Sequence, residues 1–533
     1  MKKFFALLLV ILMMVSMAAC GKSKDGDTDT TNKTGNKKSD SGKTDDSDTG
    51  AIDTSEHVVI TYMTTGDKPT NGATEEVMVE LNKILKEKVN AELEIYYIGW
   101  TDYLSNYNLT LAQMDGTVDL VGTASDWLDA WPNAKNGAFL ELSEDMLKTY
   151  APKTWAQVPT ENWEMSKYNG EIYLMPEDNF AQWINHGFIY RMDWAKEAGL
   201  TNGAHTWDDM TTYFAYVKEA YPNVIPWNSD GSHNIQLASG WMASHTNFLP
   251  IDGITAGGLY GGSRDDLYTV WSPFYEGPEL VEFAKLMKKW DDIGVWKTDV
   301  LNNTGVDNRE EMYLGQTSAD QHHTETWYGT VEPEMRKRYD IDTGFFYFGE
   351  ESSNVVSLNI THGAMAISAA SKNPERALMV YDLIRNDEEC YRLFNYGLQG
   401  KQYDLDENGY RIQPEGYNND TDAITINYWW GRNDDLELKD GKRNHEAYEK
   451  LQEEYDKVKM TYPYGQFVAE VSSIQAQINN INEIHTNYMS QIAYGKYNGS
   501  AEDIVAEYRA ALKQAGFEDV VNELQTQVND LYK

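Results

Sequence analysis

Carboxylates and indole rings alternate in the segment TASDWLDAWP, residues 123–132. Asp126 precedes Trp127, and Asp129 and Trp131 follow them. A carboxylate accepts hydrogen bonds from sugar hydroxyls, and an indole face packs on the C–H side of a pyranose ring. An apolar wall with a few placed polar groups is how a pocket holds a neutral ligand. The alternative is that one indole packs under the loop. We predict that Asp126 and Trp127 bind a sugar.

The rest of the chain adds candidates of the same kinds. Its 533 residues include 16 Trp and 35 Tyr. This high aromatic content is suited both to a core and to a surface that binds sugar rings. Neighbouring residues of a strand point to opposite faces, so His322 and His323 are not expected to face one site together. No His or carboxylate stands at a convincing zinc spacing, and neither a metal site nor a catalytic residue is expected. The further candidate ligand-binding residues are Trp183, Trp241, Asp320, His322, His362, Trp429 and Trp430.

The composition excludes some partners. Lys and Arg number 45 against 84 Asp and Glu, a net charge of −39. Such a surface repels the phosphates of nucleic acids and anionic lipids. It is typical of a solvated, soluble exterior and favours a neutral or cationic ligand only weakly. The two cysteines, Cys20 and Cys390, allow no disulfide framework, and Cys390 is expected to be buried in a helix.

The first third of the folded part alternates strands and helices, which is typical of an α/β lobe with a parallel sheet. Ligands bind such sheets where loops leave the carboxyl ends of the strands. That rule places Thr64–Lys68, Trp100 and Thr123–Trp131 at a candidate cleft. The predicted elements are strands at His57–Met63, Ala91–Ile98 and Val118–Val121, a helix capped by Thr74, and a helix over Tyr103–Met114.

Further elements follow from apolar periodicity, caps and turn residues. Thr206 and Asp209 form a predicted capping box, and Ser500 and Asp503 form another. The predicted strands are Glu171–Met175, Phe188–Tyr190 and Asp342–Phe348. The predicted helices start at Asp193, cover Asp208–Ala220 and Glu279–Trp290, and continue in a helical tail over Ile424–Trp430, Glu446–Val458 and Phe467–Ile492. The segment Gln236–Phe248 holds Trp241 and His245 among small residues and could present one aromatic residue to the cleft.

The N-terminus has the pattern of an export signal. Lys2 and Lys3 precede the apolar run Phe4–Met17, which is too short to span a bilayer comfortably. Met17-Ala18-Ala19-Cys20 resembles a bacterial lipobox, which implies a signal peptide over 1–19 and a lipid anchor on Cys20. An ordinary secretory signal is the alternative. The polar segment up to residue 56 cannot bury enough surface to fold and is expected to be a disordered tether.

Several motifs occur in an order that carries a family resemblance. A strand, a crossing segment, a strand and a helix fill Lys167–Leu200, and Lys372-Asn373-Pro374-Glu375 follows the crossing Asn359–Ser368. The chain resembles extracellular solute-binding proteins of family 1, in the long-chain lipoprotein subgroup that binds carbohydrates. The resemblance implies an α/β, type II periplasmic-binding-protein fold of two lobes joined by hinge crossings. The expected lobes are 57–178 with 318–360, and 182–315 with 365–533, the second ending in a helical extension.

The same resemblance implies the function. The chain is expected to be a monomeric, lipid-anchored cell-surface protein that closes on a carbohydrate and delivers it to the permease of an ABC importer. The aromatic residues favour a neutral oligosaccharide. One alternative is the binding component of a membrane sensor. Another is a surface glycoside hydrolase, which needs two facing carboxylates, with Asp126 beside Asp178 or Asp320.

One calcium motif has two interpretations. Asp404, Asp406, Asn408 and Glu415 fit an EF-hand loop, but no helix pair is expected around them. Asn408-Gly409 between short alternating runs is a strong hairpin signal, so a hairpin is predicted. Many relatives of the family insert a calcium loop before an Ile-Pro pair. Here that loop is missing before Ile225-Pro226, and no calcium site is carried over.

Overall fold

The computed structural model describes residues 52–177, 186–255, 257–303 and 306–532. Its contacts divide the chain into two units, Met1–Asp53 and Thr54–Lys533. The predicted signal peptide, the candidate lipid site Cys20, most of the predicted tether and the candidate Trp183 lie outside the described residues. All helices and strands described here belong to the second unit.

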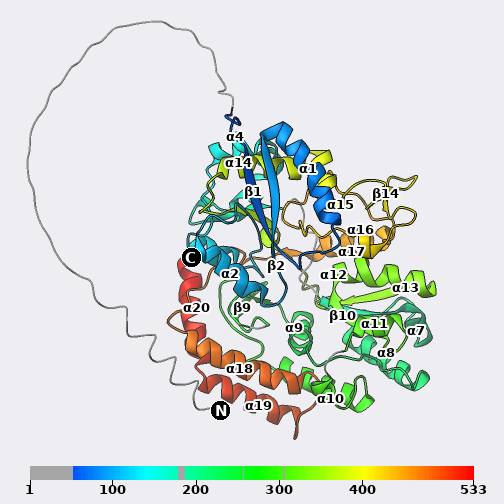
Figure 1. The fold of residues 1–533 in the computed structure, drawn as a ribbon. Coiled ribbons are helices and arrows are strands. Elements are labelled where there is room, and N and C mark those ends of the chain that lie inside the picture. Colours follow the sequence, from blue (N-terminus) through cyan, green and yellow to red (C-terminus); the bar gives the residue numbers. More distant parts are fainter. Residues whose placement is uncertain (1–51, 178–185, 256, 304–305, 533) are drawn as a thin grey trace, which may run out of the picture. The chain divides into compact units, whose positions relative to one another are not determined.

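The first sheet has the strand order β2-β1-β3-β13-β6, and its strands β1 and β2 lie side by side in Figure 1. Strand β1 pairs in parallel with β2 and β3, and β13 pairs antiparallel with β3 and β6. The sequence of β1, VVITYMTT, is rich in β-branched and aromatic residues, which fit a pleated surface buried on its faces. The strands are β1 (Val58–Thr65), β2 (Ala91–Ile98), β3 (Leu120–Thr123), β6 (Met175–Pro176) and β13 (Ala364–Ile367).

Helices pack on this sheet and share its apolar core. The predicted cap of α1 is wrong, because the N-cap is Gly72 with φ of 80°. The Thr74 hydroxyl instead accepts a hydrogen bond from the Thr425 N–H at 3.0 Å, far along the chain. The helices are α1 (Ala73–Val89), α2 (Tyr103–Gln113), α3 (Ala130–Lys135), α4 (Glu144–Tyr150), α5 (Pro152–Gln157), α6 (Thr160–Met165), α14 (Pro374–Asn386) and α15 (Glu388–Tyr396).

The second sheet has the order β10-β7-β11, with both outer strands antiparallel to β7. Its core is aromatic, and Phe188 lies edge-on to Trp227 at 5.1 Å between ring centroids. Thr206 caps α8 by accepting from the Asp209 N–H, but the predicted capping box is only half formed, because the Asp209 carboxylate accepts from the His205 N–H at 3.0 Å. The elements are β7 (His186–Arg191), β10 (Ala319–His323), β11 (Thr343–Tyr347), α7 (Met192–Glu197), α8 (Trp207–Ala220), α9 (Asn234–His245), α10 (Glu279–Ile293), α11 (Asn308–Tyr313), α12 (Thr324–Thr326) and α13 (Glu332–Tyr339).

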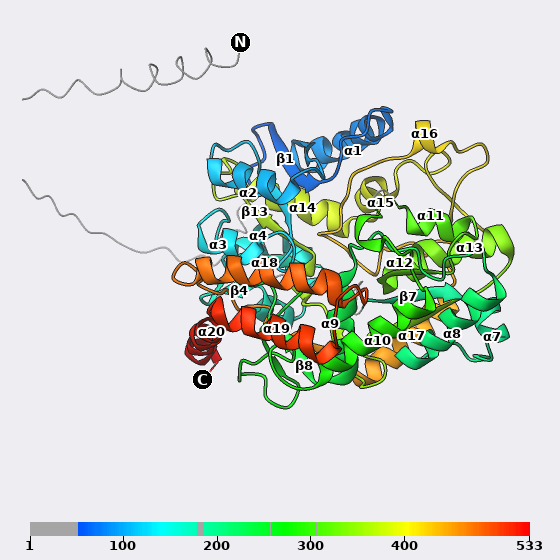
Figure 2. The same cartoon turned by 90° about the horizontal axis from the view of Figure 1, so that it is seen from below.

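The C-terminal helices cover the second lobe, where α18 and α19 run side by side (Figure 2). Both α18 and α19 contribute to the core around α9 and α10. The predicted capping box of Ser500 and Asp503 is confirmed. The helices are α17 (His445–Val458), α18 (Gln475–Ile492), α19 (Ala501–Gln514) and α20 (Phe517–Tyr532).

Short strands and turns complete the fold. The predicted hairpin at Asn408-Gly409 is confirmed, because β14 pairs antiparallel with β15 and Gly409 has φ of 78°. The short elements are β4 (Lys167–Tyr168), β5 (Glu171–Ile172), β8 (Phe248–Pro250), β9 (Gly261–Ser263), β12 (Val356–Ser357), β14 (Asp404–Leu405), β15 (Arg411–Ile412), β16 (Met460–Thr461), α16 (Asn419–Asp422), and the single turns Val300–Asn302, Trp327–Val331 and Ile360–His362.

The sheet pairing differs from the expected lobe boundaries. Strand β10 pairs with β7, so the segment 318–323 lies with the second sheet and not with the first lobe. Strand β13 pairs with β3, and α14 packs against it, so residues from 364 to the end of α15 belong with the first sheet. The order of strands along the chain does not reveal which sheet a strand joins, because pairing depends on contacts between distant residues.

The segment Ile424–Trp430 is not helical, contrary to prediction. It runs extended across the end of β1, and the Asn427 carbonyl accepts hydrogen bonds from the hydroxyls of Tyr62 and Thr64, each at 2.8 Å. Asn427 has φ of 52°, a conformation that breaks a helix. Long-range hydrogen bonds therefore override the local apolar pattern here.

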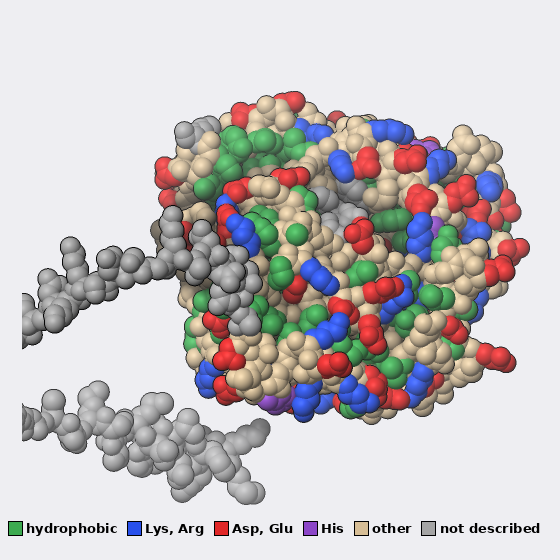
Figure 3. All heavy atoms as spheres, turned by 90° about the horizontal axis from the view of Figure 1, so that it is seen from above, with side chains coloured by type: hydrophobic (Ala, Val, Ile, Leu, Met, Phe, Trp, Pro, Cys, Tyr) green, Lys and Arg blue, Asp and Glu red, His purple; other side chains and the backbone are tan. Residues whose placement is uncertain are grey.

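Among the described residues, no helix is both long and apolar enough to cross a membrane. Acidic and basic side chains are interspersed over the face in Figure 3, although the chain carries a net charge of −39.

Candidate ligand-binding site

A cavity of about 850 Å³ lies where β2 and β3 end, and we call it the central cavity. Trp100 follows β2, and Asp126 and Trp127 follow β3, so the loops that leave these carboxyl ends form one wall. Residues around the second sheet form the facing wall, including His186 at the start of β7 and His323 at the end of β10. The cavity therefore takes side chains from both lobes.

Four indoles form a continuous cluster on the first-lobe wall. Trp100 stacks with Trp127 at 6.4 Å between ring centroids and with Trp429 at 6.1 Å, and Trp430 stacks under Trp127 at 5.7 Å. Trp429 is 44% exposed, whereas Trp430 is fully buried. The cluster presents flat apolar surface to the cavity, and its inner member is part of the core.

The backbone of the first lobe is shaped to hold this cluster. A Cβ at Gly122 in β3 would lie 2.2 Å from the Trp430 indole nitrogen, so the ring seats against bare backbone. The Asn427 amide donates to the Thr65 carbonyl at 2.8 Å, which fixes the chain just before the two tryptophans. The segment that was expected to bring Trp429 and Trp430 from the second lobe instead belongs to the first-lobe wall.

An ion pair lies in the same cavity. Nδ1 of His362 and Oδ2 of Asp126 are 2.8 Å apart. Burial lowers the pKa of His362, but the charge of Asp126 and its hydrogen bond more than offset this, and the pKa is raised overall. The pair joins the loop after β3 to the crossing segment before β13, and it holds both polar side chains at the wall of the central cavity.

Two further carboxyl groups of the cavity have raised pKa values. Burial raises the pKa of Glu177 to about 8, and its side chain is 5% exposed. Enclosure between the cavity walls, which reduces hydration, and the nearby charge of Asp126 raise the pKa of Asp252 above its ordinary value, and the residue itself remains solvent-exposed. A neutral carboxyl group both donates and accepts hydrogen bonds, which suits a ligand rich in hydroxyls.

The buried guanidinium of Arg385 positions Glu177. Arg385 is 0% exposed, and its Nη1 donates to the Pro176 carbonyl at 2.6 Å and to the Tyr381 hydroxyl at 3.0 Å. Gly363 lies against the Glu177 carboxyl, where a Cβ would approach to 2.9 Å. These contacts fix the backbone at the end of β6, where the chain leaves the first sheet.

The second-lobe wall carries neutral imidazoles and one ion pair. Burial lowers the pKa of His186 and of His323 to about 4, so both are uncharged at neutral pH. Arg443 contacts Glu325 at 3.0 Å. This wall offers imidazole nitrogens and paired charges, in contrast to the indole wall opposite.

Five of the nine predicted site residues line the central cavity, and three others lie elsewhere in the described structure. The five residues that line the cavity are Asp126, Trp127, His362, Trp429 and Trp430. Trp241 does not reach it, because it is 7% exposed and its indole donates to the Glu279 carbonyl at 2.9 Å inside the second-lobe core. Trp183, the remaining one, lies outside the described residues.

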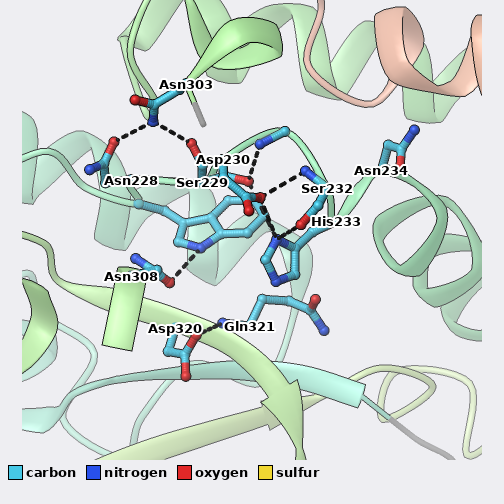
Figure 4. Close-up of polar contacts among 12 residues, drawn as sticks. Asn228, Ser229, Asp230, Ser232, His233, Asn234, Asn303, Asn308, Asp320 and Gln321 are labelled. Carbon is cyan, nitrogen blue, oxygen red and sulfur yellow. Dashed lines mark hydrogen bonds and ion pairs between the residues drawn. The ribbon is translucent and has the colours of Figure 1, made fainter. Parts of the chain in front are cut away.

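Asp320 and His322 line a separate cavity of about 420 Å³ on the other side of β10. Asp320 is 3% exposed and pairs with Arg309 at 2.9 Å. Figure 4 shows Asp320 near a polar network, in which Asn303 donates to Asn228 and to the Ser229 carbonyl. The strand alternation that separates His322 from His323 sends His323 to the central cavity instead.

Sequence reasoning missed several residues of the central cavity. Glu177 stands at the predicted first crossing, and its position next to Pro176 was a usable signal. Asp252, Glu325, Arg432 and Arg443 lie in loops or short turns with no motif around them, so nothing local marked them. Among the described residues, no group of three or more His, Cys, Asp or Glu is arranged to hold a metal ion.

Comparisons with known proteins identify the architecture. The model of the bacterial extracellular solute-binding proteins matches residues 67–388, and a domain of unknown function (DUF3502) matches residues 463–533. A protein of Streptococcus pneumoniae serotype 4, described as a carbohydrate ABC transporter substrate-binding protein, is 24% identical over 100% of this chain and 99% of its own length.

Solved structures share the fold. The N-glycan transport solute binding protein (NgtS) of Streptococcus pneumoniae is 20% identical with a TM-score of 0.71, covering 89% of this chain and 99% of its own. It has also been solved with Man1GlcNAc and with Man5GlcNAc. An extracellular solute-binding protein of Bifidobacterium longum subsp. infantis is 14% identical with a TM-score of 0.62, covering 90% and 99%.

The predicted two-lobe, type II α/β fold is confirmed by these neighbours. The family consists of binding proteins, so the glycoside hydrolase alternative is set aside. The family model spans more than half of the chain, and the chain belongs to the bacterial extracellular solute-binding proteins.

Proposed function

We propose that this protein captures an oligosaccharide in the central cavity and delivers it to an ABC importer. The observation that carries the proposal is the four-indole wall, which faces two neutral imidazoles and the Asp252 carboxyl group across a cavity of about 850 Å³. Flat apolar surface with a few polar groups is the arrangement that holds neutral sugars. The names of the pneumococcal relatives, a carbohydrate substrate-binding protein and an N-glycan binder, support the same ligand class.

The cavity favours several sugar units over one. A third cavity, of about 340 Å³, borders the central one and shares Asp126, Asp252, Leu358 and His362 with it. Trp131 lines this third cavity and not the central one, and its indole donates to the Gly465 carbonyl at 2.5 Å. A ligand that fills both spaces extends past the Asp126–His362 pair.

Lobe closure is the proposed mechanism. Asp126, Trp127 and Trp429 contact the ligand from the first lobe, while Asp252 and His323 contact it from the second. A ligand that touches both walls stabilises the closed form by its differential affinity for that form. Contact with both lobes is therefore expected to raise the closed population, which is the form that a permease would recognise.

A thermal titration tests the ligand class. Unfolding of the purified protein is followed with Man1GlcNAc, Man5GlcNAc, maltooligosaccharides, peptides and polyamines. An oligosaccharide at a hundred times its dissociation constant is expected to stabilise the folded form by about 2.7 kcal/mol, visible as a rise in Tm. A panel in which only peptides or polyamines raise Tm would contradict the proposal. Loss of uptake of the binding sugar in a deletion strain separates transport from sensing.

We also propose that Cys20 carries a lipid anchor at the outer face of the cell membrane, as the lipobox-like Met17-Ala18-Ala19-Cys20 suggests. Two acyl chains give stable membrane attachment. The full-length protein expressed in a Gram-positive host is expected to partition into the detergent phase of Triton X-114. The Cys20→Ser variant is expected in the aqueous phase. Equal partitioning of both forms would contradict the anchor.

A further inference from the structure

A cavity of about 340 Å³ next to the central cavity has no role in the mechanism above. We call it the hairpin cavity, because residues on and around the β14–β15 hairpin form it. A small aromatic core of Tyr391, Tyr396 and Tyr403 lies at its base and supports the hairpin independently of the two main cores. The residues that line it include Asn395, Gln402, Arg411, Gln413, Tyr417 and Lys442.

The hairpin cavity and the central cavity share a wall. Asn395, near the end of α15, lines both. In the segment 437–443, Glu437 and Arg443 face the central cavity, while Asp440 and Lys442 face the hairpin cavity. One ligand could therefore occupy both spaces by passing this wall.

The hairpin cavity contains a buried hydrogen-bond donor that lacks a partner. Gln402 is 7% exposed, and its Oε1 accepts from the Leu398 N–H at 2.9 Å. Its Nε2 has no hydrogen-bond partner among the described residues. Leaving a buried donor unmatched destabilises the protein, because the donor has lost its hydrogen bonds to water and gained none in exchange. Because Nε2 has almost no accessible surface, a ligand oxygen reaches it only with a shift of the neighbouring side chains, and such a contact removes this cost.

The charged groups of the hairpin cavity are already engaged. Arg411 contacts Asp440 at 2.7 Å and lies over the Tyr396 ring at 4.8 Å. Lys442 donates to the Gln413 side chain at 2.7 Å. What remains is neutral: the Gln402 and Asn395 amides, the half-buried Tyr417 ring, and Ile412, which is 37% exposed. Amide groups beside aromatic and aliphatic surface suit a neutral ligand with hydroxyl groups.

We propose that the hairpin cavity is a second carbohydrate subsite, which holds one arm of an oligosaccharide whose other sugars lie in the central cavity. This inference rests on the proposed function and deepens it, since it requires a ligand that is long or branched. The arm contacts Gln402 and Tyr417, and Asn395 contacts the ligand where it passes from one cavity to the other.

Calorimetric titration of the full-length protein tests the subsite with a short and a long glycan, Man1GlcNAc and Man5GlcNAc. If another series raises Tm in the thermal panel, its disaccharide and its longest member replace them. Tyr417→Ala and Gln402→Met, the second of which keeps the side-chain size but removes the amide, are expected to weaken binding of the long glycan about tenfold and to leave the short one unchanged. Lys439→Ala is the matched control, an exposed residue on the same segment that lines neither cavity.

The outcomes separate this inference from the proposed function. Trp429→Ala is expected to weaken both glycans, because its ring lies in the central cavity. If Trp429→Ala weakens both but the two hairpin variants leave the long glycan unaffected, the second subsite is overturned and the proposed function stands. Equal losses for both glycans in Tyr417→Ala also overturn it. If no oligosaccharide binds the wild type, both proposals fall. Unchanged Tm values confirm that the variants fold.

Discussion

Trp429→Ala is expected to lose at least about tenfold in oligosaccharide affinity, about 1.4 kcal/mol, with little change in stability. Trp429 is 44% exposed and presents its ring to the central cavity. Its neighbour Trp430 is 0% exposed and seated against Gly122. Trp430→Ala is therefore expected to cost about 3–5 kcal/mol of unfolding free energy, because it leaves a large void in the core. Calorimetry and urea unfolding measure the two effects.

Trp429 and Trp430 are adjacent tryptophans with different roles. The first variant tests ligand binding by Trp429, and the second tests core packing by Trp430. Leu314→Ala is the control, since Leu314 is 55% exposed and outside the central cavity. It is expected to change neither affinity nor stability measurably. A Trp429→Ala protein that binds the glycan as tightly as the wild type would remove the indole wall from the binding mechanism. A Trp430→Ala protein of wild-type stability would contradict its place in the core.

Acidification from pH 7 to pH 5 is expected to destabilise the protein partly through His485. His485 is 0% exposed, and its Nδ1 lies 2.8 Å from the Tyr508 hydroxyl. Burial lowers its pKa to about 3 in the folded state, against an ordinary value of 6.5. The unfolded chain therefore binds a proton first as pH falls, and stability is lost between about pH 6.5 and pH 3. The loss from this residue is about 2 kcal/mol between pH 7 and pH 5.

His485→Gln isolates this contribution, because glutamine stays neutral and can keep a hydrogen bond to Tyr508. Unfolding free energies of wild type and variant are measured by urea titration at pH 7, 6 and 5. The wild type is expected to lose about 2 kcal/mol more than the variant over this range. Tyr508→Phe removes the hydrogen bond but keeps the imidazole buried, and should retain the wild-type slope. Parallel curves for wild type and His485→Gln would show that His485 is protonated without cost in the folded state.

Local patterns in the sequence predict most of the elements that build the walls. Ala91–Ile98 is a strand with the predicted bounds, and the α8 and α19 caps are as predicted, because caps and alternation are short-range effects. The placement of Trp100, Asp126 and Trp127 at one cavity follows from the same reasoning, since each comes directly after a parallel strand. The hairpin at Asn408-Gly409 follows from turn chemistry alone.

Tertiary structure decided which distant segments join these walls. Trp429 and Trp430 reach the first lobe because Asn427 bonds to Tyr62, Thr64 and Thr65, residues more than 360 positions away along the chain. Trp241 is core and Asp320 lines another cavity, although their residue types favoured the site. Residue type and spacing determine what a side chain could do and which local element carries it. Strand pairing and burial, which depend on contacts between distant residues, determine whether that side chain reaches the cavity.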